Sequence, residues 1–246
     1  MTEDVILNGA SLTIEEICRC TGGMWQSADS ATRVNGVFTD TRTPLPGALF
    51  AAVRGPNFDG HNFVHDAISE GACAVLAEKS AGIPDDIPAV LVEDTLEALI
   101  ALAAYWRSTV NPKIVGITGS VGKTTTKELT AHLLGSVGAT AKTCGNWNNL
   151  LGLSKSLLAM PLKSDYGVFE IGSNHPGEIG ALAELMEPDC AIVTNVAPSH
   201  IEFFSDETAI ADEKADLIRA VPESGFVVLD ACSPFFSYMV EQANCR

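Results

Sequence analysis

The segment from Gly116 to Thr125 has the residue types and spacing that hold phosphate groups. It reads Gly-Ile-Thr-Gly-Ser-Val-Gly-Lys-Thr-Thr and follows an apolar run, as a loop between a strand and a helix would. Glycines let backbone N–H groups turn toward phosphate oxygens, and the N-terminus of the following helix adds partial positive charge. In such a loop Lys123 neutralises the β- and γ-phosphates, and the Thr124 hydroxyl binds Mg²⁺. The residues that we predict to hold a nucleotide here are Gly119, Ser120, Val121, Gly122, Lys123, Thr124 and Thr125.

Glu170 is a second residue that could do chemistry with a nucleotide. It stands near the end of the apolar run Val168 to Ile171, which we expect to be a buried strand. In open parallel sheets the ligand-binding residues follow the carboxyl ends of the strands. Mg²⁺ prefers carboxylate oxygens, so we predict that Glu170 is its protein carboxylate ligand. The alternative is a carboxylate that caps the next element.

The elements that must position these residues alternate between strand and helix. Short, continuously apolar runs predict parallel strands covered on both faces at Ile114–Thr118, Val168–Ile171, Ala191–Thr194 and Phe226–Leu229. The stretches between them predict helices over 123–137, 150–159, 177–186 and 207–220. Such alternation indicates an α/β domain with a mostly parallel sheet, a P-loop ATPase domain over residues 111–246.

The N-terminal part predicts a smaller α/β domain over residues 1–110, with a connecting helix that begins at Asp94 or Thr95. The turn-forming pair Asn111-Pro112 is the expected boundary between the two domains. The expected elements of the first domain are a helix over 11–23, strands at Val34–Phe38 and Ala48–Val53, a helix over 61–70 and a strand at Ala72–Ala77.

Charge, apolar runs and cysteine usage argue against several classes of partner and indicate a cellular compartment. The 246 residues carry 31 acidic and 15 basic side chains, a formal charge of −16 that disfavours nucleic acid and anionic membrane surfaces. The start Met1-Thr2-Glu3-Asp4 lacks the features of a signal peptide, and the longest apolar run, Ala98 to Trp106, is too short to span a bilayer. The seven scattered cysteines fit reduced thiols. We therefore expect a cytoplasmic protein.

Four ordered motifs make residues 111–230 resemble the Mur ligase family, in its MurF type. The phosphate loop lacks the glycine of the general Walker pattern at Ile117 and has the tighter Gly-Ser-x-Gly-Lys-Thr form typical of Mur ligases. The other three motifs are Cys144–Gly152, with Asn-x-Asn-Asn; Phe169–Ile179, with Glu-x-Gly-x-Asn; and Thr194–Glu202, followed by Lys214.

Shorter segments of the first domain resemble the part of these ligases that holds the UDP moiety. They are Thr39–Arg42, Pro46–Phe50 and Asp59–Phe63. The resemblance implies that Thr41 and Arg42 contact a UDP-linked substrate. Asp40 and Arg42 taken by themselves would more often be an ion pair on the surface.

The resemblance also implies roles for residues of the second domain. His200 would be a ligand of a second metal ion. Lys214, which could otherwise be a solvated lysine, would be catalytic and carbamylated to N6-carboxylysine, an anion able to bind Mg²⁺. Asn195 would contact the nucleotide. Asn146, Asn148 and Asn149 would contact the nucleotide or the muramoyl substrate, unless the Asn-rich segment is an ordinary turn.

The activity that the resemblance implies is an ATP-dependent amide ligase of peptidoglycan precursor synthesis. The γ-phosphoryl group of ATP would activate a carboxylate of UDP-N-acetylmuramoyl-tripeptide as an acyl phosphate, which the amine of D-alanyl-D-alanine attacks. Mur ligases close a C-terminal domain over ATP, and we expect it to be lost or supplied by another chain. The alternatives are a nucleotide- or UDP-sugar-binding remnant without turnover and a related ligase such as MurE. The Asn-x-Asn-Asn segment favours the MurF type.

Overall fold

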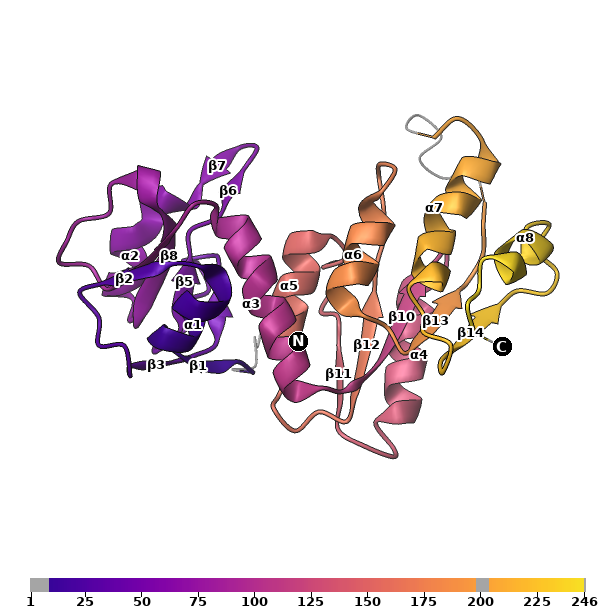
Figure 1. Ribbon diagram of the computed structural model, residues 1–246, viewed down its shortest axis with the longest axis horizontal. Helices are drawn as coiled ribbons and strands as arrows, with labels where there is room; N and C mark the ends of the chain where they lie inside the picture. Colours follow the sequence, from indigo (N-terminus) through magenta and orange to yellow (C-terminus); the bar gives the residue numbers. More distant parts are fainter. Residues whose placement is uncertain (1–8, 198–203, 246) are drawn as a thin grey trace. The chain divides into compact units, whose positions relative to one another are not determined.

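The computed structural model describes residues 9–197 and 204–245, and the chain forms two compact units (Figure 1). The first unit contains Met1–Val110 together with Leu157–Leu162, and the second contains Asn111–Ser156 and Lys163–Arg246. Both units are α/β, which confirms the predicted fold class. The participation of Leu157–Leu162 in the first unit was not expected. Within the described ranges, no helix combines the length and the apolar character that crossing a bilayer requires.

The first unit is built on a five-stranded sheet in the order β2-β9-β8-β5-β4. β4, β5, β8 and β9 run parallel, and β2 is antiparallel to β9. The strands of this unit are β1 Ser11–Thr13, β2 Met24–Gln26, β3 Arg33–Asn35, β4 Val37–Phe38, β5 Leu49–Ala51, β6 Arg54–Gly55, β7 Phe58–Asp59, β8 Ala74–Glu78 and β9 Ala89–Val92. Its helices are α1 Ile14–Thr21, α2 Val64–Ser69 and α3 Thr95–Val110, with 3₁₀ turns at Gly60–Phe63 and Lys79–Ala81.

Two predicted elements of this unit are divided in the structure. The helix expected over 11–23 begins only at Ile14, because Thr13 and Glu16 form a reciprocal capping box that starts the helix there. Residues 11–13 instead form β1, which pairs with β3. The strand expected over Val34–Phe38 is broken at Gly36, whose φ of 98° is not a strand conformation.

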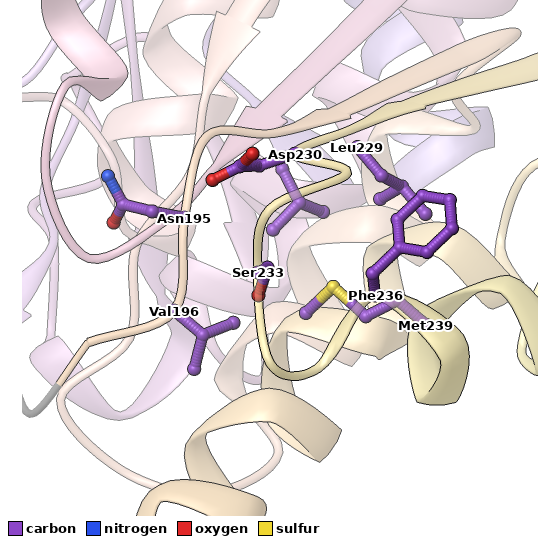
Figure 2. Close-up of a pocket in the computed structure, with 8 residues that line it drawn as sticks. Asn195, Val196, Leu229, Asp230, Ser233, Phe236 and Met239 are labelled. Carbon is purple, nitrogen blue, oxygen red and sulfur yellow. The ribbon is translucent and has the colours of Figure 1, made fainter.

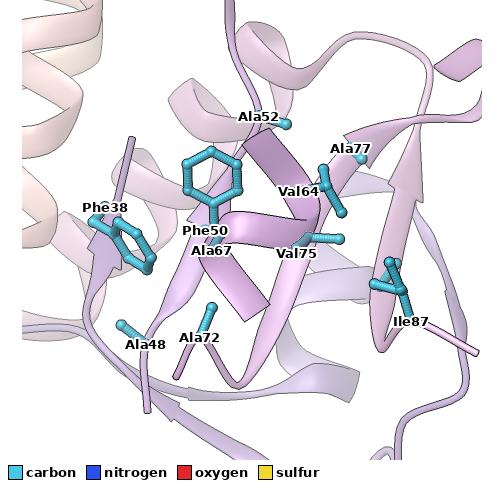
Figure 3. Close-up of a cluster of buried hydrophobic side chains, with 11 residues drawn as sticks. Phe38, Ala48, Phe50, Ala52, Val64, Ala67, Ala72, Val75, Ala77 and Ile87 are labelled. Atoms are coloured by element: carbon cyan, nitrogen blue, oxygen red, sulfur yellow. The ribbon is translucent and has the colours of Figure 1, made fainter. Parts of the chain in front are cut away.

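The core of the first unit lies between its sheet and α2 (Figure 3). Phe38 and Phe50 come from neighbouring strands, and their ring centroids lie 5.2 Å apart. The same buried cluster contains Ala48 and Ala52 on either side of β5, Val75 and Ala77 of β8, and Val64 and Ala67 of α2. Trp106 of α3 is 2% exposed and donates from Nε1 to the Met160 carbonyl at 2.8 Å, which holds the segment around residue 160 in this unit.

The second unit is built on a fully parallel sheet in the order β11-β12-β10-β13-β14. Its strands are β10 Lys113–Thr118, β11 Thr140–Lys142, β12 Tyr166–Glu170, β13 Cys190–Val193 and β14 Phe226–Leu229. Its helices are α4 Lys123–Leu134, α5 Leu150–Leu158, α6 Glu178–Met186, α7 Glu207–Arg219 and α8 Phe236–Glu241, with the end of α5 belonging to the first unit. The central strand β10 leads into α4 through residues 119–122, so the predicted phosphate loop stands at the middle of the sheet.

Helices cover both faces of this sheet. Ile117 and Val168 pack against Ala131 of α4, whereas a side chain at Gly116 would meet Met186 of α6 and Leu217 of α7. Successive residues of a strand point to opposite faces, so α4 lies on one face and α6 and α7 lie on the other. Three apolar residues of the predicted helix 123–137, namely Leu129, Leu133 and Val137, do not face this core and are 60–71% exposed. The helix also ends earlier than predicted, at Leu134.

Candidate nucleotide-binding site

A cavity of about 200 Å³ opens where β10 and β12 end, and all of its lining residues belong to the second unit. Gly119, Ser120 and Lys123 come from the loop and helix after β10, and Gly172 to Asn174 follow β12. The remaining lining residues are Asn148, Asn149, Glu178 and Lys214. The carboxyl ends of neighbouring parallel strands are the usual place for a ligand in this class of sheet.

The loop after β10 turns through two glycines with positive φ. Gly119 has φ 147° and Gly122 has φ 86°, both in the region that L residues with side chains rarely adopt. A Cβ atom on Gly119 would overlap the Thr194 hydroxyl, whereas one on Gly122 would meet no atom within 4 Å. Gly119 is therefore required both by its backbone conformation and by the close approach of Thr194.

Asn195 holds this loop through its side chain and its backbone. The Val121 N–H donates to Asn195 Oδ1 at 2.9 Å, and Asn195 Nδ2 donates to the Val121 carbonyl at 3.0 Å. The Ser120 N–H donates to the Asn195 carbonyl at 3.1 Å. Ser120 Oγ in turn donates to the Ala197 carbonyl and accepts from the Ala197 N–H. Asn195, which we predicted to contact the nucleotide, lies outside the cavity lining and contacts the loop.

Lys123 lines the cavity from the first residue of α4. Its ammonium donates to the Gly119 carbonyl at 2.6 Å, so it lies across the loop that it follows. Burial lowers the pKa of Lys123, and the negative charge of Glu170 opposes this shift. The amide groups in the first turn of α4 have no intrahelical partners and point along the same helix end, so the region attracts anions.

Thr124 and Glu170 form the pair that fits a magnesium ion. Thr124 Oγ1 donates to Glu170 Oε2 at 2.9 Å, and Glu170 is 3% exposed. No cluster of three or more His, Cys, Asp or Glu side chains able to hold a metal exists among residues 9–197 and 204–245. Mg²⁺ does not need such a cluster, since it retains waters and takes one or two carboxylates plus substrate phosphates. A buried carboxylate against a threonine hydroxyl is a set of oxygen donors of that kind.

Lys214 of α7 reaches the same cavity. It is 6% exposed, and burial lowers its pKa to about 8, with a further contribution from the charge of Lys123 and an opposing one from Glu213. Glu213 is also buried, and its two carboxylate oxygens accept from the N–H groups of Gly177 and Ile179 at 2.6 and 2.8 Å. Glu213 thereby holds the start of α6 against α7.

The cavity brings together only part of the predicted site. The predicted residues in its lining are Gly119, Ser120, Lys123, Asn148, Asn149 and Lys214. Asn149 Oδ1 also accepts from the Gly152 N–H at 2.8 Å, a bond typical of a helix start, and Asn146 is exposed outside the lining. Val121, Gly122, Thr124 and Thr125 belong to the loop and helix beside the cavity. His200 lies outside the described residues.

The predicted substrate residues of the first unit lie on its surface. Arg42 is 88% exposed by side chain and pairs with Asp40 at 2.6 Å, which is the surface ion pair that the sequence left open. Thr41 lies between them. In the segment Asp59–Phe63, His61 is buried between the Asp59 carboxylate and the Glu78 N–H, which it contacts through Nδ1 and Nε2. Both ring nitrogens of His61 therefore have a structural role.

A narrow crevice lies on the other side of Asn195 from the loop, between the ends of β13 and β14 (Figure 2). Its walls are apolar, from Val196, Leu229, Phe236 and Met239, and its polar groups are those of Asn195, Asp230 and Ser233. Asn195 thus joins the crevice to the phosphate loop.

Several residues of the site were missed or given no role in the sequence analysis. Asn174 and Glu178 line the cavity, and each lies in a motif quoted above. Glu213 could have been suspected only from its position beside Lys214. Lys127 lies one turn after Lys123 and Thr124 and is only 1% exposed. The sequence gives no sign of this burial, because most lysines are exposed.

Family models match nearly the whole described chain. The Mur ligase middle domain matches residues 117–246, and the catalytic domain of the Mur ligase family matches residues 33–117. The UDP-N-acetylmuramoyl-tripeptide–D-alanyl-D-alanine ligase of Escherichia coli K12 is 38% identical over 221 residues, which is 90% of this chain and 48% of that protein. The enzyme of the same name from Synechocystis is 40% identical over 80% of this chain and 44% of its own length.

Solved structures agree with these relatives. A crystal structure of MurF from Acinetobacter baumannii superposes with a TM-score of 0.88 at 30% identity, covering 96% of this chain and 52% of that one. MurF from Thermotoga maritima in complex with ADP superposes with a TM-score of 0.77 at 32% identity, covering 85% and 49%. The chain spans about half the length of the curated relatives that it matches. With the middle-domain match over more than half of its residues, the chain belongs to the Mur ligase family.

Proposed function

We propose that this chain provides the nucleotide-binding and substrate-binding units of an ATP-dependent ligase that joins D-alanyl-D-alanine to UDP-N-acetylmuramoyl-tripeptide. The observation that carries the proposal is the hydrogen bond from Thr124 to the buried Glu170 at the side of a phosphate loop, next to a cavity lined by Lys123 and Lys214. The names of the relatives from Escherichia coli and Synechocystis supply the substrates. The ADP complex of the Thermotoga maritima protein supports a nucleotide ligand.

The phosphates of ATP are assigned to the loop and to the start of α4. Gly119 and Gly122 give the loop its shape, Asn195 keeps it in place, and Lys123 turns from the Gly119 carbonyl toward the β- and γ-phosphates. Thr124 and Glu170 would hold Mg²⁺, which neutralises phosphate charge when two anions approach each other. Charge neutralisation and alignment are the main requirements of phosphoryl transfer.

The proposed reaction has two steps. A carboxylate oxygen of the muramoyl tripeptide bonds to the γ-phosphorus as the bond to the leaving ADP oxygen breaks. The amine of D-alanyl-D-alanine then attacks the acyl carbon, loses a proton and expels phosphate. Lys123 faces the cavity, so its positive charge can stabilise the anions of the first step.

Lys214 is proposed to carry the carbamate that the family resemblance implies. The nitrogen of the neutral amine would bond to the carbon of CO₂ and lose a proton, giving N6-carboxylysine. Burial next to Lys123 favours the neutral amine, with a pKa of about 8. The product would be an anion that lines the same cavity as Lys123. His200 remains a proposed ligand of a second metal ion on the resemblance alone.

The first unit is proposed to hold the UDP part of the substrate, with Thr41 and Arg42 as contacts. The strongly exposed guanidinium of Arg42 is held by Asp40 in a fixed position on the surface, and it could be shared with a diphosphate. Asn146 and Asn149 are proposed to contact the nucleotide or the muramoyl group. ATP and UDP-linked precursors are cytoplasmic metabolites, so we place the reaction in the cytoplasm.

Calorimetry and a phosphate-release assay test this function in order. The chain is first titrated with ATP in Mg²⁺, with the Lys123→Ala variant as the matched control. It is then combined with the C-terminal half of one of the curated relatives, and phosphate release is measured with the tripeptide substrate and D-alanyl-D-alanine. Release that needs both substrates supports the ligase. ATP binding without release in any combination would favour a binding remnant, and release with a free diamino acid instead would favour a MurE-type ligase.

A further inference from the structure

A buried lysine one turn into α4 has no part in the function proposed so far. Lys127 is 1% exposed, and its ammonium donates to the Thr143 carbonyl at 3.0 Å and pairs with Glu128 at 3.1 Å. A buried charge is costly unless hydrogen bonds and an opposite charge compensate it. An apolar residue would fill the same space against the sheet without that cost, so the specific contact with Thr143 needs an explanation.

Thr143 has each of its polar groups occupied, and one of its bonds leads to the proposed magnesium ligand. Its N–H donates to the Val168 carbonyl at 3.1 Å, its carbonyl accepts from Lys127, and its hydroxyl accepts from the Glu170 N–H at 2.9 Å. Thr143 is itself 1% exposed. The Glu170 N–H is thus held by the hydroxyl of Thr143, and α4 holds the backbone carbonyl of Thr143 through Lys127.

These contacts close a ring that includes both candidate metal ligands, Thr124 and Glu170. Starting from α4, Lys127 bonds to Thr143, Thr143 to the amide of Glu170, and the carboxylate of Glu170 to the hydroxyl of Thr124, which is again on α4. Thr124 and Lys127 are three residues apart and so lie on neighbouring positions of one helix face. The ring fixes Glu170 at its backbone and at its carboxylate relative to the same helix.

We infer that Lys127 and Thr143 are positioning residues that set the Glu170 carboxylate against the Thr124 hydroxyl at the spacing that a divalent cation needs. The inference rests on the proposed nucleotide site and adds two residues that touch neither nucleotide nor metal. Mg²⁺ demands near-ideal octahedral geometry. A displacement of Glu170 should therefore lower the affinity of the site for Mg²⁺ more than it lowers the affinity of the loop for phosphate. Replacing either positioning residue should therefore weaken only the part of nucleotide binding that depends on Mg²⁺.

The test measures the dissociation constant for ATP by calorimetry, once in saturating Mg²⁺ and once in EDTA. Thr143→Val keeps the shape of the side chain and removes the acceptor for the Glu170 N–H. We expect the gain in affinity on adding Mg²⁺ to fall by about fivefold or more, as for the loss of one hydrogen bond, with the EDTA value unchanged. Thr143→Ser, which restores the hydroxyl, should recover the gain. Ser156→Ala is the matched control, because it removes another buried hydroxyl of this unit, bonded to the Gly152 carbonyl at 2.9 Å.

A second variant keeps the inference testable if Thr143→Val does not fold. Lys127→Met keeps the apolar stem, removes only the ammonium, and should show the same metal-confined loss. A folded Thr143→Val or Lys127→Met protein with the wild-type Mg²⁺ gain, or with equal losses in Mg²⁺ and EDTA, would overturn the positioning role. Wild-type protein that binds no ATP in either buffer would instead remove the proposed nucleotide site, and this inference with it.

Discussion

The hydroxyl of Thr194 occupies the space that a side chain on residue 119 would need. A Cβ atom built on Gly119 would overlap Thr194 Oγ1, and the hydroxyl itself donates to the Val121 carbonyl at 2.6 Å. The end of β13 therefore packs directly against the phosphate loop that follows β10. Two neighbouring strands together determine the shape of the loop.

Replacing Gly119 with alanine should deform the loop. The new Cβ meets Thr194, and φ 147° is unfavourable for alanine, so the loop must shift. We expect the affinity for ATP in Mg²⁺ to fall at least about tenfold, the equivalent of roughly 1.4 kcal/mol. Equilibrium dialysis with labelled ATP measures this. Gly180→Ala, within α6 of the same unit, should bind as the wild type does, and equal affinity of both variants would contradict the steric account.

Asn195→Leu should loosen the loop even before any nucleotide is present. The substitution removes the bonds to the N–H and the carbonyl of Val121 at 2.9 and 3.0 Å. Each such bond contributes about 1 kcal/mol net, so the Val121 amide should exchange with solvent on the order of tenfold faster. Hydrogen exchange of the nucleotide-free protein, followed by NMR, gives the rate. An unchanged rate combined with weaker ATP binding would show that Asn195 acts on the nucleotide directly.

Lys214 should form a carbamate that carbon-13 NMR detects. Protein equilibrated with ¹³C-bicarbonate near pH 8, where the amine is partly neutral, is expected to give a carbamate resonance, because burial lowers the pKa of this group to about 8. The Lys214→Arg variant should lack the resonance, whereas replacing the exposed Lys163 should leave it in place. A spectrum without that resonance in the wild type, with and without Mg²⁺, would contradict the proposed modification.

The contact between α7 and α8 should be sensitive to acid. The Tyr238 hydroxyl donates to Asp212 at 2.5 Å, and this bond, followed by the bond from Arg219, lowers the pKa of Asp212. A carboxyl whose pKa is lower in the folded state stabilises the fold above its unfolded pKa, and that contribution is lost as the pH falls through the folded value. Asp212 is 57% exposed by side chain, so we expect Tyr238→Phe to cost only about 0.5 kcal/mol of unfolding free energy at neutral pH.

Urea denaturation at a series of pH values follows this difference. The gap between Tyr238→Phe and the wild type should shrink from neutral pH to acid as Asp212 becomes protonated in both proteins. A gap that stays constant down to acid pH would assign the effect to packing of the tyrosine ring and not to the charge of Asp212.

The parallel strands of the second unit could be predicted because their signal is local. The four apolar runs that identify β10, β12, β13 and β14 lie within one or two residues of the observed strands. β11 was missed because Thr140–Lys142 is a short strand at the edge of the sheet, half-exposed and without an apolar run. β2 and the β6–β7 hairpin are equally short, and only their pairing partners define them.

The loop was predictable for the same local reason, whereas its supports were not. Gly119, Gly122, Lys123 and Thr124 lie within six consecutive residues, and their spacing alone identifies them. Thr143 and Glu213 act through hydrogen bonds to residues 27 and about 35 positions away in the sequence. A motif of closely spaced residues does not reveal such distant partners. The polar contact of Asn195 was assigned to the nucleotide from resemblance, and the structure adds its bonds to Val121.

The most direct test of the central claim locates a metal ion beside the bound nucleotide. Crystals of the protein grown with Mn²⁺ and a non-hydrolysable ATP analogue allow the ion to be placed by its anomalous scattering. We predict one peak at about 2.2 Å from both Thr124 Oγ1 and a carboxylate oxygen of Glu170, with the γ-phosphate between the ion and Lys123. Phosphates bound away from residues 119–124, or a manganese peak that contacts neither Thr124 nor Glu170, would contradict the account.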